Sequence, residues 1–194
     1  GAPGSWKAIG GEGAGEVVAL GEGVTGFAVG DRVMARCAGA FSEYALMDTA
    51  EAMHVPDPLS WEEAGSVPLT FLVSYDMLVL QGKIQKGHWA CLGLDVGIQT
   101  RLPDFSAQVL QATDQKGAHL AINTVGGSLF AESVRSLAFE GRLATVGYVD
   151  GVLHADIDLE ALHARRLTFF GVSNKLRTKA QKSAAVPRFM EEVL

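Results

Sequence analysis

The chain has 194 residues, of which 48% are hydrophobic; this is enough for a core in one large or two small domains, and too apolar for disorder. The formal net charge of −6 argues against a nucleic-acid-binding surface, which requires clustered positive charge. Because two cysteines, Cys37 and Cys91, cannot build a disulfide framework and no uninterrupted apolar run reaches the roughly 18 residues that cross a bilayer, we expect a cytoplasmic protein with no membrane partner.

Short β-type runs alternate with glycine turns over residues 9–46. The expected strands are residues 17–20, 32–35 and 41–47. Glycine at the intervening turns permits backbone angles that a side chain would forbid. Strands at such close spacing favour an antiparallel meander or a small barrel.

The glycine-rich run Gly11-Glu12-Gly13-Ala14-Gly15 has the composition of a dinucleotide-binding loop. Such a loop follows a strand and opens a helix. Here the next run, residues 17–20, is predicted to be a strand that ends at a glycine turn. We therefore interpret the glycines as close backbone packing within the meander.

A helix is predicted to begin at Ser60, because Glu63 three residues later completes a capping box. Pro68 then interrupts it, and its missing N–H suits the first turn of a further helix. Gly82 would end that second helix. Apolar residues recur at helical spacing along it and form one face: Leu69, Leu72, Val73, Met77 and Leu80.

The second half of the chain alternates between β and α patterns, which favours a parallel sheet with covering helices. The expected strands are residues 87–92, 95–100, 120–127, 142–148 and 167–172. The expected helices follow Asp104 and cover residues 129–139, 159–166 and 180–194, the last one restarted at Pro187.

Three motifs in the first half carry a family resemblance. They are Gly10-Gly11-Glu12-Gly13-Ala14-Gly15, then Val29-Gly30-Asp31-Arg32-Val33, then Gly39-Ala40-Phe41-Ser42-Glu43-Tyr44. In this order they resemble the medium-chain dehydrogenase/reductase superfamily, in its zinc-free, zeta-crystallin-like NADPH:quinone oxidoreductase branch. The resemblance implies an α/β fold: a GroES-like antiparallel β-barrel catalytic domain over residues 1–67 and a Rossmann-type parallel-sheet domain over residues 68–194, both incomplete.

The resemblance also exposes an internal gap. In the family, a glycine-rich phosphate loop follows the first strand of the nucleotide domain. Here the chain passes from Cys91 to residues 92–98, which look like a much later strand, so that about two βα units are missing, on the order of 50 residues. That loop normally directs backbone N–H groups and a helix N-terminus at the cofactor's pyrophosphate.

The resemblance implies NADPH as the cofactor, held near its nicotinamide by three strand ends. Many relatives also place a threonine against the nicotinamide; that place corresponds to Val73, or to Ser74 if the alignment shifts by one, and valine cannot hydrogen-bond the carboxamide. Thr100 and Arg101 fall near the adenosine side or simply at the surface. The strand ends are either cofactor contacts or ordinary strand-to-helix turns: Thr124, Val125, Gly126, Val146, Gly147, Tyr148, Phe170, Gly171 and Val172.

No metal site and no catalytic acid or base is predicted. Zinc-dependent relatives carry a histidine directly before the glutamate of the first motif, where this chain has Gly11, and no four-cysteine cluster is present. Tyr44 is interpreted as core packing. The histidines are scattered and more typical of surface or locally bonded residues than of catalysts: His54, His88, His119, His154 and His163.

Three hypotheses follow. The first is an oxidoreductase that transfers hydride from NADPH to a quinone or activated alkene without zinc; the resemblance implies a homodimer through an edge strand, residues 167–172, with Leu167 at its start. The second is a non-catalytic fragment of the same fold that acts through protein–protein association. The third is that these residues are an excerpt of a longer protein, which would favour the first.

Overall fold

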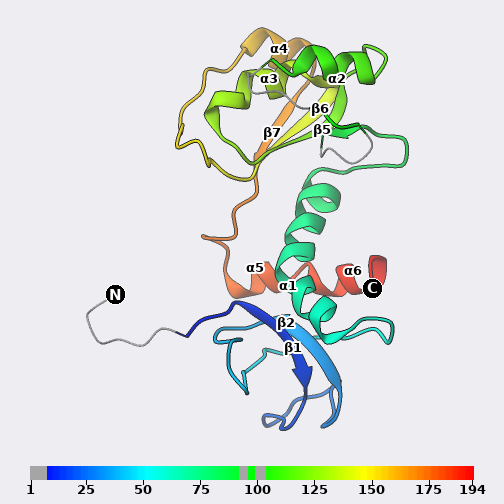
Figure 1. Ribbon diagram of the computed structural model, residues 1–194, viewed down its shortest axis with the longest axis vertical. Coiled ribbons are helices and arrows are strands. Elements are labelled where there is room, and N and C mark those ends of the chain that lie inside the picture. The colour runs from blue at the N-terminus through cyan, green and yellow to red at the C-terminus, as the bar shows by residue number, and fades with distance from the viewer. Residues whose placement is uncertain (1–7, 92–95, 99–103) are drawn as a thin grey trace, which may run out of the picture. The chain divides into compact units, whose positions relative to one another are not determined.

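The computed structural model describes residues 8–91, 96–98 and 104–194 (Figure 1). They form two compact units. Unit 1 comprises the described residues up to Tyr75 together with Asn174–Leu194, and unit 2 comprises those within Asp76–Ser173. The predicted division into residues 1–67 and 68–194 concerns functional domains and stays a prediction.

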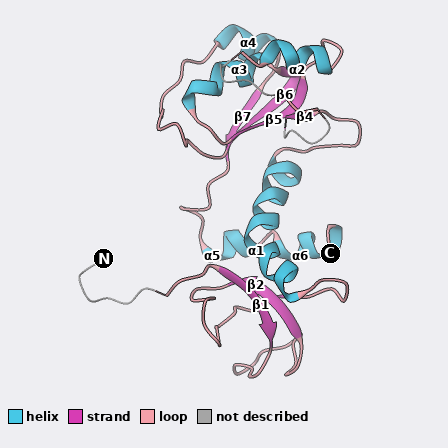
Figure 2. Cartoon of the chain, in the orientation of Figure 1, coloured by secondary structure: helices cyan, strands magenta, loops and turns pink. Residues whose placement is uncertain are grey.

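Unit 1 contains an antiparallel sheet of strands β1 (Glu12–Glu16), β2 (Arg32–Arg36) and β3 (Met53–His54), in that order (Figure 2). Ala14 of β1 pairs with Met34 of β2, which in turn pairs with Met53 of β3. Both methionine side chains are fully buried and form the centre of the unit's core. The antiparallel expectation is confirmed, as an open sheet within the described residues.

Two expected strands are wrong, because the glycine-rich run is itself a strand. Gly13 and Gly15 of β1 pair with Ala35 and Val33 of β2. Residues 17–20 form no strand; Val17 N donates to Asp31 O at 2.9 Å and Gly30 N donates to Val17 O at 2.8 Å. Residues 41–47 contain no strand, and Tyr44, expected in the core, is 73% exposed. No helix follows the glycines, which agrees with the interpretation that they do not form a dinucleotide-binding loop.

Helix α1 (Trp61–Tyr75) begins with the expected capping box. Ser60 N donates to Glu63 Oε2 at 2.9 Å, and Glu63 N donates to Ser60 Oγ at 3.2 Å. The expected break at Pro68 is wrong: the helix continues through this fully buried proline. The N–H of the next residue, Leu69, donates to Glu12 Oε2 at 2.5 Å, so that β1 supplies an acceptor beside the proline.

We expect Ser60→Ala to destabilise unit 1 by about 1 kcal/mol, because it removes an acceptor for an otherwise unsatisfied helix N–H. Urea unfolding followed by tryptophan fluorescence measures the loss. Ser66→Ala is the matched control, since Ser66 lies exposed inside the same helix and its hydroxyl bonds only to Glu63 O. Equal midpoints for the two variants would contradict this account.

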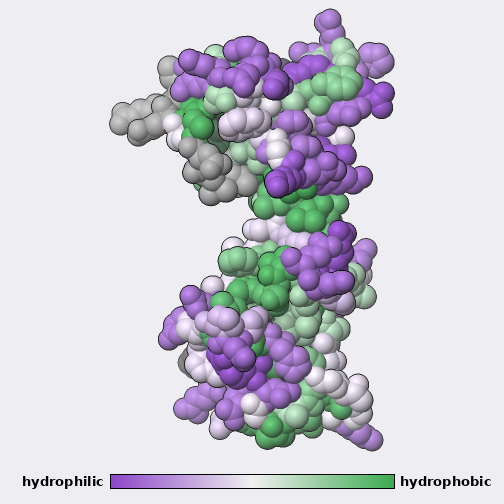
Figure 3. All heavy atoms as spheres, turned by 90° about the vertical axis from the view of Figure 1, so that its right-hand side faces the viewer, coloured by the Kyte–Doolittle hydropathy of each residue, from purple (hydrophilic) through white to green (hydrophobic). Residues whose placement is uncertain are grey.

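A π-helical segment, η1 (Asp76–Gln81), extends α1 and ends before Gly82, as expected. Over Trp61–Gln81 the helical stretch is long and apolar enough, by length and composition, to cross a bilayer, with 28% of its most apolar window buried. Apolar spheres reach the surface along it in Figure 3. Length and composition alone are weak evidence for a membrane span, and α1 packs against β1 and β2, so we assign it no membrane location.

Unit 2 is built on a parallel sheet of β4 (Ala90–Cys91), β5 (Ala118–Asn123), β6 (Leu137–Thr145) and β7 (Thr168–Gly171), which lie side by side in chain order. Helices α2 (Ser106–Ala112), α3 (Phe130–Arg135) and α4 (Leu159–Ala164) alternate with the strands, as Figures 1 and 2 show. The expected α/β class, with one antiparallel and one parallel sheet, is thereby confirmed. The core of the unit consists of buried Ala121, Val134, Leu137, Leu143 and Leu167.

Three further expectations in the second half need correction. The helix expected over residues 129–139 is a 3-10 turn, η2 (Gly127–Leu129), followed by α3, and it ends at Arg135 because Leu137 already pairs with Ala118 in the sheet. Residue Phe105, not Asp104, precedes the first turn of α2. Of the strand expected over residues 95–100, only residues 96–98 are described, and they are irregular.

The C-terminal segment agrees with the sequence analysis. Helix α5 (Lys179–Ser183) is followed by α6 (Val186–Glu192), which has Pro187 in its first turn. Phe189 of α6 is 1% exposed and packs edge-on against Tyr75 of α1, with ring centroids 5.6 Å apart. The proline therefore restarts the helix and helps to dock it in unit 1.

A buried carboxylate joins two helices of unit 2. Glu132 of α3 is 6% exposed and accepts bonds of 2.8 Å from Ser106 N of α2 and from Arg135 Nε. Burial acts to raise the pKa of Glu132, but the bond from Ser106 and the charge and bonds of Arg135 outweigh it and hold this pKa below its ordinary value.

We expect Glu132→Gln to cost about 1 kcal/mol at pH 7. A lowered carboxyl pKa stabilises the fold above the unfolded pKa, roughly 4.3, and this contribution disappears as pH falls through the folded pKa. Urea unfolding at a series of pH values should therefore show the wild type and the variant converging in acid. A difference that does not depend on pH would show that the ionised form is not favoured.

Candidate functional site

The carboxyl ends of three parallel strands meet at one edge of the unit 2 sheet. Asn123 of β5 pairs with Thr145 of β6, and Thr145 pairs with Gly171 of β7. Just beyond, Val146 N donates to Asn123 O at 2.9 Å and Val172 N donates to Thr145 O at 3.1 Å. The sequence-predicted residues that follow these strands therefore lie together, at the edge where open α/β sheets bind ligands.

Asn123 shapes the turn after β5. Its side chain is 4% exposed, and Nδ2 donates to Gly126 O at 2.8 Å. Its Oδ1 accepts from Val125 N and Gly126 N, both at 3.0 Å. Sequence reasoning did not single out this residue; the signal was a lone amide at the end of the apolar run from Leu120 to Ile122.

Asp150 ties the loop after β6 to the turn after β5. Its Oδ2 accepts from Ser128 N at 2.9 Å and from Ser128 Oγ at 2.5 Å, and its Oδ1 accepts from Val152 N at 2.9 Å. The Ser128 hydroxyl is the main reason that the pKa of Asp150 lies below its ordinary value. The first two N–H groups of η2 are therefore already occupied, since Ser128 N donates to the Asp150 carboxylate and Gly127 N donates to Val152 O.

Two glycines let the loops approach each other. Gly126 has φ 131° and ψ −154°, a conformation open essentially to glycine alone, and a Cβ there would collide with the Asp150 carboxylate. A Cβ on Gly147 would lie 2.9 Å from Thr124 O. Both positions were sequence-predicted site residues, and both allow backbone to lie where a side chain would fit badly.

The remaining sequence-predicted residues have different surroundings. Thr124, Tyr148 and Gly171 are exposed, and a Cβ on Gly171 would meet open space. Val125, Val146 and Phe170 are half-buried, whereas Val172 is buried. Val73 lies half-buried on α1, in unit 1, and Thr100 lies outside the described residues.

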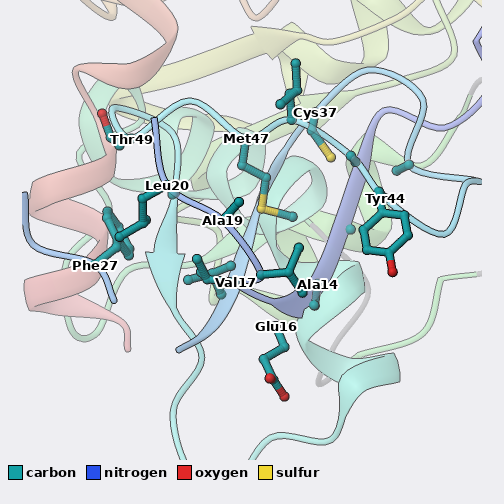
Figure 4. Close-up of a pocket in the computed structure, with 18 of the residues that line it drawn as sticks. Ala14, Glu16, Val17, Ala19, Leu20, Phe27, Cys37, Tyr44, Met47 and Thr49 are labelled. Atoms are coloured by element: carbon teal, nitrogen blue, oxygen red, sulfur yellow. The ribbon is translucent and has the colours of Figure 1, made fainter. Parts of the chain in front are cut away.

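Unit 1 has a mostly apolar cavity of about 600 Å³ beside β1. Figure 4 shows Phe27 and Leu20 together at one side of it and Met47 near Cys37 at another. Burial is the main reason that the pKa of the Cys37 thiol is raised, with the Glu12 carboxylate adding to the effect, and both causes disfavour the thiolate.

A second cavity of unit 1, about 860 Å³, is bordered by charged side chains and by Gly11, where zinc-dependent relatives carry their histidine. It shares Cys37, Leu46 and Met47 with the apolar cavity, so the two adjoin. Its charged lining residues come from parts of the chain that are far apart in the sequence: Arg36, Asp48, Glu51, Lys179 and Lys182.

Two sequence families match this chain. The alcohol dehydrogenase GroES-like domain matches residues 2–57, and the zinc-binding dehydrogenase family matches residues 85–190, more than half of the chain. The chain belongs to the zinc-binding dehydrogenase family. This confirms the resemblance to the medium-chain dehydrogenase/reductase superfamily that the glycine motifs indicated.

Despite the name of the family, the described residues contain no group of zinc ligands. Within residues 8–91, 96–98 and 104–194, no three His, Cys, Asp or Glu side chains lie close enough together to hold a metal ion. The donor set that zinc requires is thus not found in that part of this family member, and no chemical step is derived through a metal.

The relatives of this zinc-binding dehydrogenase family member include very large enzymes. A highly reducing polyketide synthase of Glarea lozoyensis is 28% identical over 210 residues, which take in 87% of this chain and 8% of the relative. A polyketide synthase subunit of Mycobacterium tuberculosis is 26% identical over 219 residues, covering 93% of this chain and 10% of the relative. The chain thus spans a tenth or less of the length of these curated relatives.

Solved structures share the fold at low sequence identity. A mycobacterial protein complexed with NADPH has a TM-score of 0.76 and 23% identity, with 95% of this chain and 71% of that chain covered. The CurK enoyl reductase has a TM-score of 0.73 and 19% identity, with 95% and 67% covered. A quinone oxidoreductase of Pseudomonas syringae has a TM-score of 0.73 and 22% identity, with 95% and 70% covered.

The residues at the carboxyl edge fit one end of a nicotinamide dinucleotide. Gly147 and Gly171 expose backbone, and Thr124 and Tyr148 offer hydroxyls, which suits a neutral ring carboxamide and ribose. The pyrophosphate fits this edge less well, since the N–H groups of Ser128 and Gly127 in the nearest helical turn already donate to Asp150 and to Val152 O. The edge therefore fits the nicotinamide end.

Proposed function

We propose that this chain is an oxidoreductase that uses NADPH to reduce a quinone or an activated alkene without zinc. The observation that carries the proposal is the row formed by Asn123, Thr145 and Gly171, which brings three strand ends to one ligand-binding edge. Membership of the zinc-binding dehydrogenase family and the fold shared with an NADPH complex support it.

Bound NADPH would supply the hydride. The chain's part is to position the nicotinamide and to keep the site dry. Asn123 fixes the turn after β5 through three hydrogen bonds, and Asp150 locks the loop after β6 against it. These hydrogen bonds would hold the backbone and hydroxyl groups of the two turns in place, so that the ring carboxamide would have a preferred orientation.

An activated alkene is the better supported acceptor. The polyketide synthase relatives and the enoyl reductase fold neighbour point to reduction of a carbon–carbon double bond next to a carbonyl group. The quinone oxidoreductase neighbour supports the quinone alternative. Both acceptors are conjugated carbonyl compounds that develop negative charge on a carbonyl oxygen as hydride arrives, so the demands on the protein are similar.

We also propose that two copies pair through the free edge of β7. The sheet order leaves one side of Thr168–Gly171 unpaired within the described residues, and an open strand edge favours pairing with another chain. Light scattering after gel filtration would show twice the chain mass. A mass equal to that of a single chain would contradict this pairing.

The competing proposal is a non-catalytic chain that acts by association. The alignment with the Glarea lozoyensis enzyme extends over 210 residues although only 87% of this 194-residue chain takes part, so that relative has residues with no counterpart here. The break after Cys91 is where the family's phosphate loop is expected. A chain without that loop would lack the main pyrophosphate donors.

NADPH titration of the full chain distinguishes the two proposals. An oxidoreductase should change the fluorescence of NADPH with a saturable dependence, and a quinone or a cyclic enone should then accelerate NADPH oxidation. NADH is the control for the 2′-phosphate. Failure of millimolar NADPH to bind a folded dimer would favour the association proposal, whereas turnover would exclude it.

A further inference from the structure

The apolar cavity beside β1 is formed by unit 1 alone. Its lining residues fall within residues 13–33 and 37–52, all of which belong to that unit. Its volume of about 600 Å³ lies within the range of roughly 300–1,000 Å³ that is typical of small-molecule sites in proteins. A ligand of this cavity therefore needs no residue of unit 2.

Large apolar side chains on the wall of this cavity are exposed to water. Val18 is 60% exposed, Leu20 42% and Leu46 94%. In Figure 4, Leu20 lies beside Phe27 at one side of the cavity, and Met47 lies at another. Covering such side chains is favourable by about 25 cal/mol for each Å² of apolar surface removed from water. The wall therefore favours a ligand with a hydrocarbon part.

The formal charges on the wall are negative. Glu16 and Glu43 line the cavity, and within the described part of the chain no lysine, arginine or histidine does. Both glutamates are exposed, and Figure 4 shows the Glu16 carboxylate extending away from the apolar side chains around Val17. Carboxylates at the rim attract a positively charged group and repel a negatively charged one.

Cys37 gives an independent indication of the same sign of potential, at the end where the two cavities adjoin. Burial raises the pKa of its thiol most, and the negative charge of Glu12 raises this pKa further. A dominant positive charge nearby would lower it instead. The potential at this end of the apolar cavity is therefore also unfavourable for an anion.

We propose that the apolar cavity binds a small amine, a molecule with a hydrocarbon chain or ring and one protonated amino group. The hydrocarbon part lies against Leu20, Phe27 and Met47, and the ammonium group lies at the rim with Glu16 and Glu43. Because both carboxylates are exposed, the hydrocarbon part supplies most of the affinity and the charge supplies selectivity of a few fold. The site lies wholly in unit 1, so binding there is independent of hydride transfer.

The experiment is a titration of the ¹⁵N-labelled full chain at low salt, followed by two-dimensional NMR. The probes are octylamine, octan-1-ol and octanoate, which share one chain length and differ in charge. We expect octylamine and octanol to shift the backbone amides of Gly13, Gly15 and Gly21, which line the cavity. Octylamine should bind about threefold more tightly than octanol, and octanoate should bind most weakly. Added salt should reduce these differences, because it screens exposed charges.

Two variants locate the site, each with a matched control. Glu43→Gln should reduce the preference for octylamine over octanol about twofold, whereas Glu160→Gln, which removes an exposed carboxylate of unit 2, should leave it unchanged. Leu20→Asn should weaken the binding of both probes about threefold. Leu153→Asn, which replaces an exposed leucine of unit 2, should not affect either probe.

The proposal is overturned if no probe shifts these amides, or if octanoate binds as tightly as octylamine. It is also overturned if Glu160→Gln lowers the amine preference as much as Glu43→Gln, since net charge alone would then explain the selectivity. Shifts of the same amides on dilution of the chain without any probe would show that a second copy covers the cavity, and would overturn it as well.

Discussion

Replacing Gly126 with alanine is expected to raise the dissociation constant for NADPH by more than about tenfold. The residue is buried at φ 131°, and strain in this region for a residue other than glycine is roughly 1–3 kcal/mol. The new Cβ would also collide with the Asp150 carboxylate. The turn after β5 must therefore move, and with it the row of backbone groups at the carboxyl edge. Fluorescence titration with NADPH measures the change.

The control for this prediction is Gly15→Ala. Gly15 lies in β1, has no positive φ, and a Cβ there would meet nothing within 4 Å. Its NADPH affinity should equal that of the wild type. Circular dichroism must show that Gly126→Ala remains folded, so that lost binding reflects the site. An unchanged affinity in a folded Gly126→Ala variant would mean that this turn does not contact the cofactor.

The alternation of strands and helices in the second half could be predicted because each parallel strand is a compact apolar run, such as residues 120–122 before Asn123. In the first half, the strand predicted over residues 17–20 is wrong for a physical reason. The glycine-rich β1 pairs through backbone alone, whereas the apolar residues 17–20 line a cavity and only Val17 among them bonds to the facing chain at residues 30 and 31. Likewise, helix propensity predicted that the helix would end at Pro68. In the structure the helix continues, and Glu12 supplies an acceptor for the N–H of the next residue, Leu69.

The candidate site shows a similar division. Glycines at strand ends, such as Gly126 and Gly147, are visible in a sequence, and the structure brings them to one edge. Asn123 and Asp150 could not be singled out, because their importance lies in hydrogen bonds across loops that meet only in the fold. Arg36 and Lys182 are more distant still: 146 positions separate them along the chain, yet both border the second cavity.

Arg36→Met is expected to destabilise unit 1 by about 3–5 kcal/mol, because it leaves the Glu51 carboxylate, only 6% exposed, without its partner. Glu51→Leu should cost a comparable amount by stranding the guanidinium. The double variant should cost less than the sum, since no buried charge is left unpaired. Urea unfolding of the four proteins measures this coupling.

The exposed ion pair between Arg166 and Glu140, 3.0 Å apart, provides the control: Arg166→Met should change stability by less than about 0.5 kcal/mol. If Arg36→Met costs no more than that, water reaches the Arg36–Glu51 pair and its burial has no energetic consequence.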